Sequence, residues 1–175
     1  MWPVILTLWF VLWNVTKQRV LDVKRMRQAK ILVKKPPEDG KEKVLVIEDY
    51  TAIWPVYDRA LYENYDVHFV ASAEEGLVEI EKHPYRVVIA DLKLGKEKMD
   101  GVEFVKQAKC KYPFIYYIVA TGHIEQFPLD KVLYYFNEIL VKSFGIDMLR
   151  IAVHRGVKQS VRWYKIADGT YEFKN

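Results

Sequence analysis

The stretch VVIADLKL, residues 87–94, decides the fold class of this 175-residue chain. It opens with four consecutive apolar residues, three of them β-branched, and the run stops at Asp91. Apolar residues at consecutive positions are typical of a strand buried on both faces, as the central strands of parallel sheets are. A carboxylate directly after such a strand is a candidate for chemistry at the edge of the sheet.

Four further apolar runs resemble this one and alternate with segments of helical periodicity. They lie at residues 44–47, 67–70, 115–120 and 139–141. Ser72 and Asp100 are each followed three residues later by a glutamate, the spacing of a capping box at a helix start. Strands that alternate with helices predict an α/β fold, a doubly wound five-stranded parallel sheet with right-handed crossovers.

The last helical segment is the most regular one. Its apolar stripe consists of Leu149, Val153, Val157 and Val161, and its neighbouring polar stripe of Arg150, His154, Lys158 and Arg162. These two stripes predict a helix through Arg162 that packs on the sheet with one side. We interpret the polar stripe as a solvated helix face.

The segment KKPPEDG, residues 34–40, marks a domain boundary. Two prolines and a glycine stand there among charged residues, a composition that ends a helix and forms a linker. We therefore expect a helical N-terminal arm with its linker at residues 1–37, a globular domain at 38–163 and a tail at 164–175. The tail is too short for a DNA-binding or enzymatic module, so no direct DNA binding is expected.

The positive charge of the chain is concentrated in the arm. The formal net charge is +4, but residues 1–43 contain ten Lys or Arg against four Asp or Glu, and the remaining residues contain seventeen against nineteen. The domain itself therefore has no overall attraction for nucleic acid.

Cysteine and histidine give no indication of a metal site. Cys110 is the only cysteine, which excludes an intrachain disulfide and a cysteine-based zinc cluster. The four histidines lie at positions 68, 83, 123 and 154, without the spacing typical of metal ligands.

The arm begins with WPVILTLWFVLWNV, residues 2–15, which carry no charge and are followed by a basic stretch. A bilayer-spanning helix needs about 20 apolar residues, so this segment is short for a span. Three interpretations stay open. The segment is a membrane anchor that tethers the domain to the inner face of the cell membrane, a helix docked on the domain or a partner, or translation upstream of a true start at Met26. We favour the anchor, because tryptophans near both ends and the basic flank suit a membrane interface.

Polar residues follow four of the five expected strands. They are Glu48 and Asp49 after the first, Asp91 after the third, Thr121 after the fourth and Lys142 after the fifth. Parallel strands bring these ends to one edge of the sheet, where three carboxylates would repel one another without a cation such as Mg²⁺. A lysine and a threonine opposite complete a receptor for a phosphoryl group, with Asp91 as the candidate nucleophile.

These residues stand in motifs that resemble the response-regulator receiver family over residues 43–162. The motifs are VLVIED (44–49), VVIADLKL (87–94), MDG (99–101), VATG (119–122) and LVKSF (140–144). The resemblance implies the flavodoxin-like receiver fold. It also implies a signalling module of two-component systems and not an enzyme, one that promotes only its own aspartyl phosphorylation and dephosphorylation.

The resemblance implies a role for each of the strand-end residues. Asp91 would be the phosphoacceptor, Thr121 would bind a phosphoryl oxygen and Lys142 would pair with the phosphoryl group. The implied ligands of Mg²⁺ or Mn²⁺ are Glu48, Asp49, Asp91 and the backbone carbonyl of Lys93. The implied donor is a phosphohistidine on a sensor histidine kinase or histidine phosphotransfer protein. The domain itself is then expected to be cytoplasmic.

Three features depart from the family pattern. The family usually has a proline with a cis peptide after the conserved lysine, whereas Ser143 stands here. Since a cis bond before a non-proline residue costs about 3 kcal/mol, we expect a trans peptide and a differently aimed Lys142. Residues 95–98, GKEK, replace a proline-containing loop, and Ile139 stands where an aromatic switch residue is common.

The sequence therefore predicts a phosphoacceptor receiver that signals through protein contacts. One alternative is a pseudo-receiver that keeps the fold and binds partners without phosphorylation, and the departures favour it. A second alternative is a flavodoxin-like cofactor binder. Its phosphate loop would need Ser, Thr or Gly after the first strand, where Glu48, Asp49 and Tyr50 stand instead.

Overall fold

A five-stranded parallel sheet forms the centre of the domain. The structure, a computed structural model, describes residues 40–95, 99–160, 162–165 and 171–174. The strands of this sheet are β1 (Glu42–Ile47), β2 (Tyr65–Val70), β3 (Tyr85–Ala90), β4 (Tyr116–Thr121) and β5 (Glu138–Val141). Their order is β2-β1-β3-β4-β5, and every neighbouring pair is parallel. The predicted doubly wound α/β fold is confirmed.

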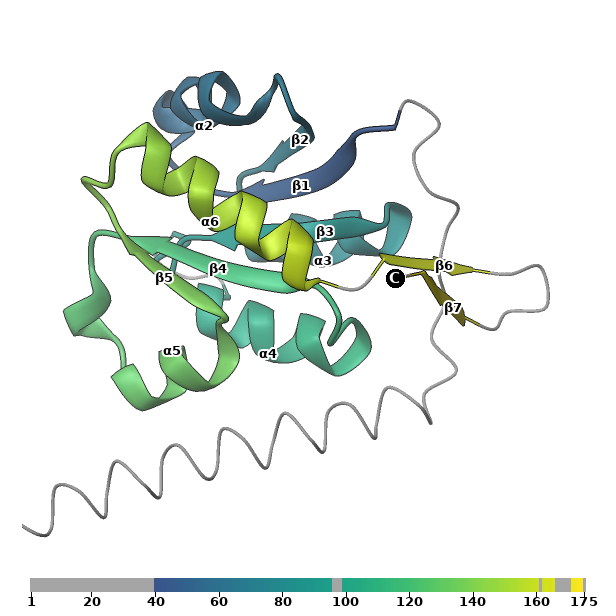
Figure 1. Cartoon of the computed structure of the whole chain (residues 1–175). Coiled ribbons are helices and arrows are strands. Elements are labelled where there is room, and N and C mark those ends of the chain that lie inside the picture. The colour runs from purple at the N-terminus through teal and green to yellow at the C-terminus, as the bar shows by residue number, and fades with distance from the viewer. Residues whose placement is uncertain (1–39, 96–98, 161, 166–170, 175) are drawn as a thin grey trace, which may run out of the picture. The chain divides into compact units, whose positions relative to one another are not determined.

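Helices cover both faces of the sheet. The α-helices are α2 (Trp54–Leu61), α3 (Ala73–Lys82), α4 (Gly101–Lys111), α5 (Leu129–Tyr135) and α6 (Ile146–Gln159), and two 3₁₀ turns are η1 (Thr51–Ile53) and η2 (Ile124–Gln126). Helices α2 and α6 lie on one face, and α3, α4 and α5 lie on the other (Figure 1). The central strands β3 and β4 are therefore buried along their whole length, as consecutive apolar residues predicted.

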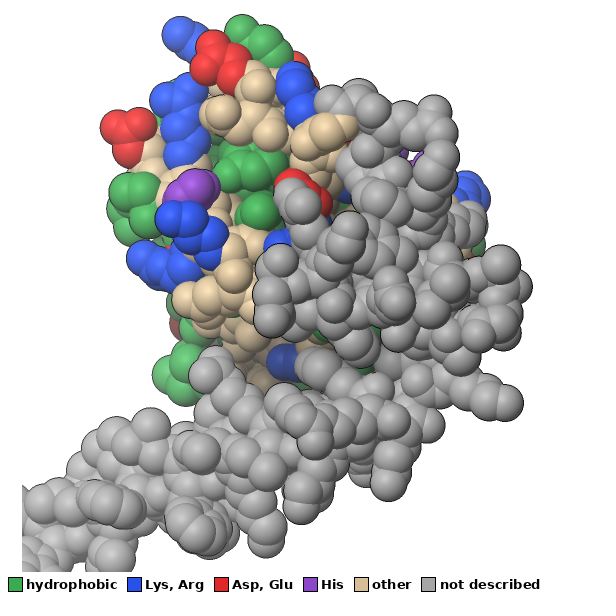
Figure 2. Space-filling view, turned by 45° about the vertical axis from the view of Figure 1, so that its right-hand side comes forward, with side chains coloured by type: hydrophobic (Ala, Val, Ile, Leu, Met, Phe, Trp, Pro, Cys, Tyr) green, Lys and Arg blue, Asp and Glu red, His purple; other side chains and the backbone are tan. Residues whose placement is uncertain are grey.

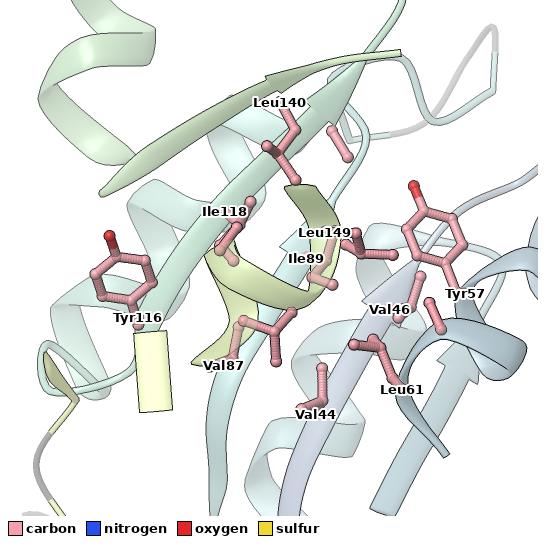
Figure 3. Close-up of a cluster of buried hydrophobic side chains, with 14 residues drawn as sticks. Val44, Val46, Tyr57, Leu61, Val87, Ile89, Tyr116, Ile118, Leu140 and Leu149 are labelled. Carbon is pink, nitrogen blue, oxygen red and sulfur yellow. The ribbon is translucent and has the colours of Figure 1, made fainter. Parts of the chain in front are cut away.

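The core beneath α2 and α6 is built from alternate residues of the strands. Figure 3 shows this cluster, which includes Val44 and Val46 of β1, Val87 and Ile89 of β3, Ile118 of β4, Leu61 of α2 and Leu149 of α6. Each fully buried aliphatic side chain of this size stabilises the fold by about 1.5–3 kcal/mol. The core thereby fixes the strand ends that carry the polar residues.

Two helices begin at the residues that the capping pattern indicated. The hydroxyl of Ser72 accepts a hydrogen bond from the Glu75 amide at 3.2 Å at the start of α3. The carboxylate of Asp100 accepts one from the Glu103 amide at 2.8 Å at the start of α4. Each bond satisfies a backbone donor that the helix itself cannot, so both predicted starts are confirmed.

The last helix is shorter than the sequence pattern predicted. It ends at Gln159, and Arg162 belongs to strand β6 (Arg162–Lys165), so the expected continuation through Arg162 was wrong. Ser160 ends the helix with an extended backbone, and its carbonyl and hydroxyl oxygens accept hydrogen bonds from Arg86 of β3, each at 2.9 Å. Strand β6 pairs with β7 (Tyr171–Lys174) in an antiparallel hairpin.

The polar stripe of α6 is solvated, because Arg150, His154 and Lys158 are all exposed. Figure 2 shows that acidic side chains lie among the basic ones on the face in view. Residues 2–15, to which we assigned the anchor, lie outside the described residues. No helix in the described part of the chain is both long and apolar enough to span a bilayer.

Candidate functional site

The carboxyl ends of the strands open into a hollow that collects most of the predicted site residues. Its lining consists of Glu48, Asp49, Tyr50, Asp91, Lys93, Gly95, Gly122, His123 and Lys142. We call Glu48, Asp49, Asp91 and Lys142 the acidic pocket. Strands β1 and β3 place its carboxylates, and strand β5 places its lysine opposite them.

Lys142 joins two of the three carboxylates. Its ammonium lies 2.5 Å from Asp91 Oδ2 and 2.7 Å from Glu48 Oε2. Burial works to lower the pKa of Lys142, but hydrogen bonds and charge attraction from Asp91 and Glu48 outweigh burial and raise it. The lysine therefore stays charged and offsets part of the negative charge of the pocket.

Glu48 is the most enclosed of the three acids, with 1% of its surface exposed. Burial raises its pKa above the ordinary glutamate value of 4.5, although Lys142 pulls the other way. Its Oε2 lies close to the lysine charge but has no well-directed hydrogen bond within the described residues. The indole of Trp54 donates to the Glu48 backbone carbonyl at 3.0 Å and holds this residue in place.

The loop after β3 wraps around Asp91. The Lys93 amide donates to Asp91 Oδ1 at 3.3 Å, and the Gly95 amide donates to Asp49 Oδ2 at 3.1 Å. Gly101 approaches so closely that a Cβ on it would lie 2.1 Å from the Asp91 backbone oxygen. In the MDG motif, the aspartate therefore caps α4. The glycine, which has no side chain, lets the start of α4 lie directly against the backbone of Asp91.

Thr121 sits at the end of β4 with a fully buried side chain. Its hydroxyl accepts a hydrogen bond from the His123 amide at 3.2 Å, and its carbonyl accepts one from the Lys142 amide at 2.8 Å. The threonine thus connects strand β5 to the loop with Gly122 and His123 that lines the hollow. Its hydroxyl is occupied within this loop in the absence of a phosphoryl group.

Ser143 changes the backbone after Lys142 without withdrawing the lysine. No peptide bond among the described residues is cis, so the expected trans peptide is confirmed, and Ser143 has φ of 97°. A non-glycine residue in this region is strained by roughly 1–2 kcal/mol. The ammonium nonetheless reaches both Asp91 and Glu48, so the expectation of a differently aimed lysine was wrong.

The acidic pocket fits a hard divalent cation. Glu48, Asp49 and Asp91 each offer a carboxylate oxygen, and these oxygens lie within 4.8 Å of one another. The buried Glu48 Oε2 lies 2.7 Å from the Lys142 ammonium, and a carboxylate oxygen has a second lone pair that can bind a metal ion. Oxygen donors of this kind suit Mg²⁺ or Mn²⁺.

Sequence reasoning missed residues that support the pocket from its flank. Trp54 holds Glu48, and Tyr57 is buried close enough that burial first, then the charges of Glu48 and Asp91, raise the pKa of its phenol. Both residues belong to α2, at positions that only the folded helix brings to the pocket. No local motif marks them.

The comparisons with known proteins agree with this geometry. Residues 44–154 match the model of the response regulator receiver domain. A hydrogenase transcriptional regulatory protein, HoxA of Cupriavidus necator, is 31% identical over 87 residues, which are 50% of this chain and 18% of that protein. The chain therefore spans less than a fifth of the length of this curated relative.

Solved receiver structures are also similar. A CheY-like receiver domain protein from Methanospirillum hungatei shares 25% identity with a TM-score of 0.60, covering 69% of this chain and 97% of that one. A receiver domain protein from Clostridium thermocellum shares 26% identity with a TM-score of 0.61, covering 67% and 94%. The chain belongs to the response-regulator receiver family, a family of signalling modules of two-component systems.

Proposed function

We propose that the domain accepts a phosphoryl group on Asp91 from a phosphohistidine of a sensor histidine kinase or histidine phosphotransfer protein. The observation that carries this proposal is the position of Asp91, whose carboxylate faces the Lys142 ammonium at 2.5 Å beside two further acids. Since such donors present their phosphohistidine in the cytoplasm, the domain would act there. It would then pass the signal on by binding other proteins.

In this proposal Asp91 attacks the phosphorus atom with a carboxylate oxygen. An O–P bond forms, the N–P bond of phosphohistidine breaks, and the histidine leaves as a neutral imidazole after taking up a proton. Glu48, Asp49, Asp91 and the Lys93 carbonyl would hold Mg²⁺ or Mn²⁺. The bound ion would neutralise charge on the phosphoryl oxygens.

Lys142 and Thr121 would respond to the new group. The ammonium that joins Glu48 and Asp91 would move to a phosphoryl oxygen, which carries more charge than the carboxylate it leaves. The Thr121 hydroxyl, which accepts from the His123 amide, would donate its own proton in a hydrogen bond to a second phosphoryl oxygen. Both movements change the loop that borders the hollow and so give partners a surface to distinguish.

Phosphorylation of the full chain by acetyl phosphate, with and without Mg²⁺, tests the proposal by intact mass. We expect a Mg²⁺-dependent gain of one phosphoryl group that Asp91→Asn abolishes. Asp130→Asn, at an exposed aspartate of α5, is the matched control and keeps the gain. A wild type that never gains the group would contradict the proposal.

The alternative is a pseudo-receiver that binds partners without phosphorylation. Ser143, with its positive φ, and Ile139, in place of an aromatic residue, favour this alternative. The contact between Lys142 and Asp91 speaks against it, because the catalytic pairing survives the altered loop. Absence of phosphorylation in the experiment above would select the pseudo-receiver.

A further inference from the structure

A second group of titratable residues lies on the α3 side of the sheet, remote from the acidic pocket. His68 comes from β2, Glu79 from α3, and His83 from the residue that ends α3. We call these three residues the histidine cluster. Tyr85, which contacts it, begins β3, whereas Asp91 follows the other end of that strand. Six residues at about 3.3 Å each separate the two sites by roughly 20 Å.

The cluster has the dimensions of a metal site. Glu79 Oε1 lies 3.4 Å from His68 Nδ1 and 3.4 Å from His83 Nε2, and one ligand atom from each of the three residues lies within 4.8 Å of the other two. Zinc binds such ligands at about 2.0–2.1 Å in a tetrahedron, which separates neighbouring ligand atoms by about 3.3–3.4 Å. Two of the ligand separations therefore already equal those of a tetrahedral site.

The surroundings of His68 orient its ring for this purpose. Asp66 Oδ1 lies 3.2 Å from His68 Nε2. Without a metal, His68 Nδ1 faces Glu79 and Tyr85 as a hydrogen-bond donor. When Nδ1 gives up its proton to a metal ion, Asp66 can accept a hydrogen bond from Nε2 and hold the ring in place. Metal-binding histidines characteristically donate their second N–H to a carboxylate in this way. Lys43, which lies 3.5 Å from the same Nε2, is paired with Asp66, so its charge is locally balanced.

Glu79 and Tyr85 complete the cluster. The Tyr85 hydroxyl lies 2.9 Å from Glu79 Oε1 and 2.7 Å from His68 Nδ1. Burial works to raise the pKa of Glu79, but hydrogen bonds from Tyr85, His68 and Lys82 outweigh it and hold that pKa below its ordinary value.

We propose that His68 Nδ1, Glu79 Oε1 and His83 Nε2 bind one Zn²⁺ ion, or a first-row divalent ion of similar preference. Two imidazole nitrogens and one carboxylate form a ligand set that zinc uses when it keeps a fourth position for water. All three side chains are partly exposed, at 27%, 17% and 40%, so an ion from solution can enter and bring that water. Tyr85 would turn its hydroxyl from His68 to this water.

Binding would fasten the edge strand β2 to helix α3 and to the start of β3. Among the described strands, β2 pairs only with β1, so it is held by hydrogen bonds along one edge and by side-chain contacts on its two faces. An ion that binds the native state and not the unfolded chain raises the free energy of unfolding in proportion to the logarithm of its concentration. The site would therefore stabilise the receiver in response to available zinc.

Titration of the full chain with ZnCl₂ by isothermal calorimetry tests the proposal. A large excess of Mg²⁺ in the buffer occupies the acidic pocket, and Asp91→Asn run in parallel shows whether zinc enters there. We expect one Zn²⁺ per chain in both proteins, and at least about tenfold weaker binding in His68→Ala and His83→Gln. His154→Ala, at an exposed histidine of α6, is the matched control and retains wild-type affinity.

Asp66→Asn is a further variant for this titration, and it leaves all three proposed ligands in place. We expect it to weaken zinc binding by about 10–100-fold, because it removes the carboxylate charge behind His68 and leaves the Lys43 ammonium unbalanced beside the ring. Co²⁺ in place of Zn²⁺ should give the visible absorption of a tetrahedral complex, and His83→Gln should abolish it. Absence of zinc binding to the wild type, or equal affinity in His68→Ala, His83→Gln and the wild type, would overturn the proposal.

Discussion

The acidic pocket and the histidine cluster both contain carboxylates within the folded domain, but the pKa of the carboxylate is shifted in opposite directions at the two sites. In the acidic pocket, three carboxylates face one ammonium, and burial raises the pKa of Glu48. In the histidine cluster, hydrogen bonds from a phenol, an imidazole and an ammonium overcome burial and lower the pKa of Glu79. The acidic pocket therefore has too little positive charge to balance its carboxylates, whereas in the histidine cluster hydrogen-bond donors already stabilise the charge of Glu79.

This difference indicates what each site can bind. A pocket short of positive charge gains from a divalent cation and then from the phosphoryl group that the cation and Lys142 attract. A cluster with satisfied hydrogen bonds is stable without an ion and exchanges hydrogen-bond donors for a metal only where the ligand geometry suits it. Four predictions, ordered by the size of the expected effect, test this contrast.

The largest effect is expected for Lys142→Ala. We expect phosphorylation by acetyl phosphate to slow by about a hundredfold, because a charge aimed at the transferring group is lost. Mg²⁺ should bind more tightly at the same time, because the ammonium no longer competes for Asp91 and Glu48. Lys158→Ala, at an exposed lysine of α6 outside the hollow, serves as the control. Weaker Mg²⁺ binding in Lys142→Ala would contradict the contrast.

Gly101→Ala should destabilise the domain by about 1–3 kcal/mol, measured by chemical unfolding. The added methyl group would lie 2.1 Å from the Asp91 backbone oxygen, so the loop or the start of α4 must shift. Gly145→Ala is the control, because nothing lies within 4 Å of its added Cβ, and it should cost less than about 1 kcal/mol. Equal destabilisation by both variants would show that Asp91 is not positioned by this close approach.

Tyr85→Phe should cost about 1–2 kcal/mol, because two partly buried hydrogen-bonding partners lose the hydroxyl. Phosphorylation of Asp91 should proceed at the wild-type rate, since the two sites are far apart. Tyr50→Phe, at a tyrosine with 65% exposure, is the control for stability. A change in phosphorylation caused by Tyr85→Phe would show that the two sites are coupled.

The smallest effects concern pH, and they have opposite signs at the two sites. A raised pKa at Glu48 means that the native state binds more protons than the unfolded chain, so this residue lowers stability as the pH rises above about 4.5. A lowered pKa at Glu79 adds stability that is present above about 4.5 and lost as the pH falls. In Mg²⁺-free buffer, the stability of Glu48→Gln relative to the wild type should therefore rise with pH, and that of Glu79→Gln should fall. If the relative stabilities of the two variants changed with pH in the same direction, the contrast between the two sites would be refuted.

The acidic pocket could be predicted from the sequence because the strand topology alone brings its residues together. Asp49 and Asp91 follow buried strands and Lys142 follows the partly buried edge strand β5, and the ends of parallel strands meet at one edge whatever the details of packing. Strands β1, β3 and β4 were readable because consecutive apolar residues mark strands covered on both faces, whereas the edge strands β2 and β5 are only partly buried. The roles of these residues in phosphorylation remain predictions.

The histidine cluster could not be predicted in this way. His68 lies within a strand and Glu79 within a helix, so the packing of α3 against the sheet brings them together. Tyr85 reaches them where the register between β1 and β3 shifts. The end of α6 was missed for a similar reason, because Arg86 of a distant strand binds Ser160 and the apolar period continues past it.

The most direct test of the central claim is to locate the phosphoryl group. Borohydride reduces an aspartyl phosphate to homoserine, which peptide mass spectrometry then finds in the chain. After reaction of the full chain with acetyl phosphate and Mg²⁺, the account predicts homoserine at position 91 and at no other acidic position. Modification at position 49, or an unmodified position 91, would contradict it.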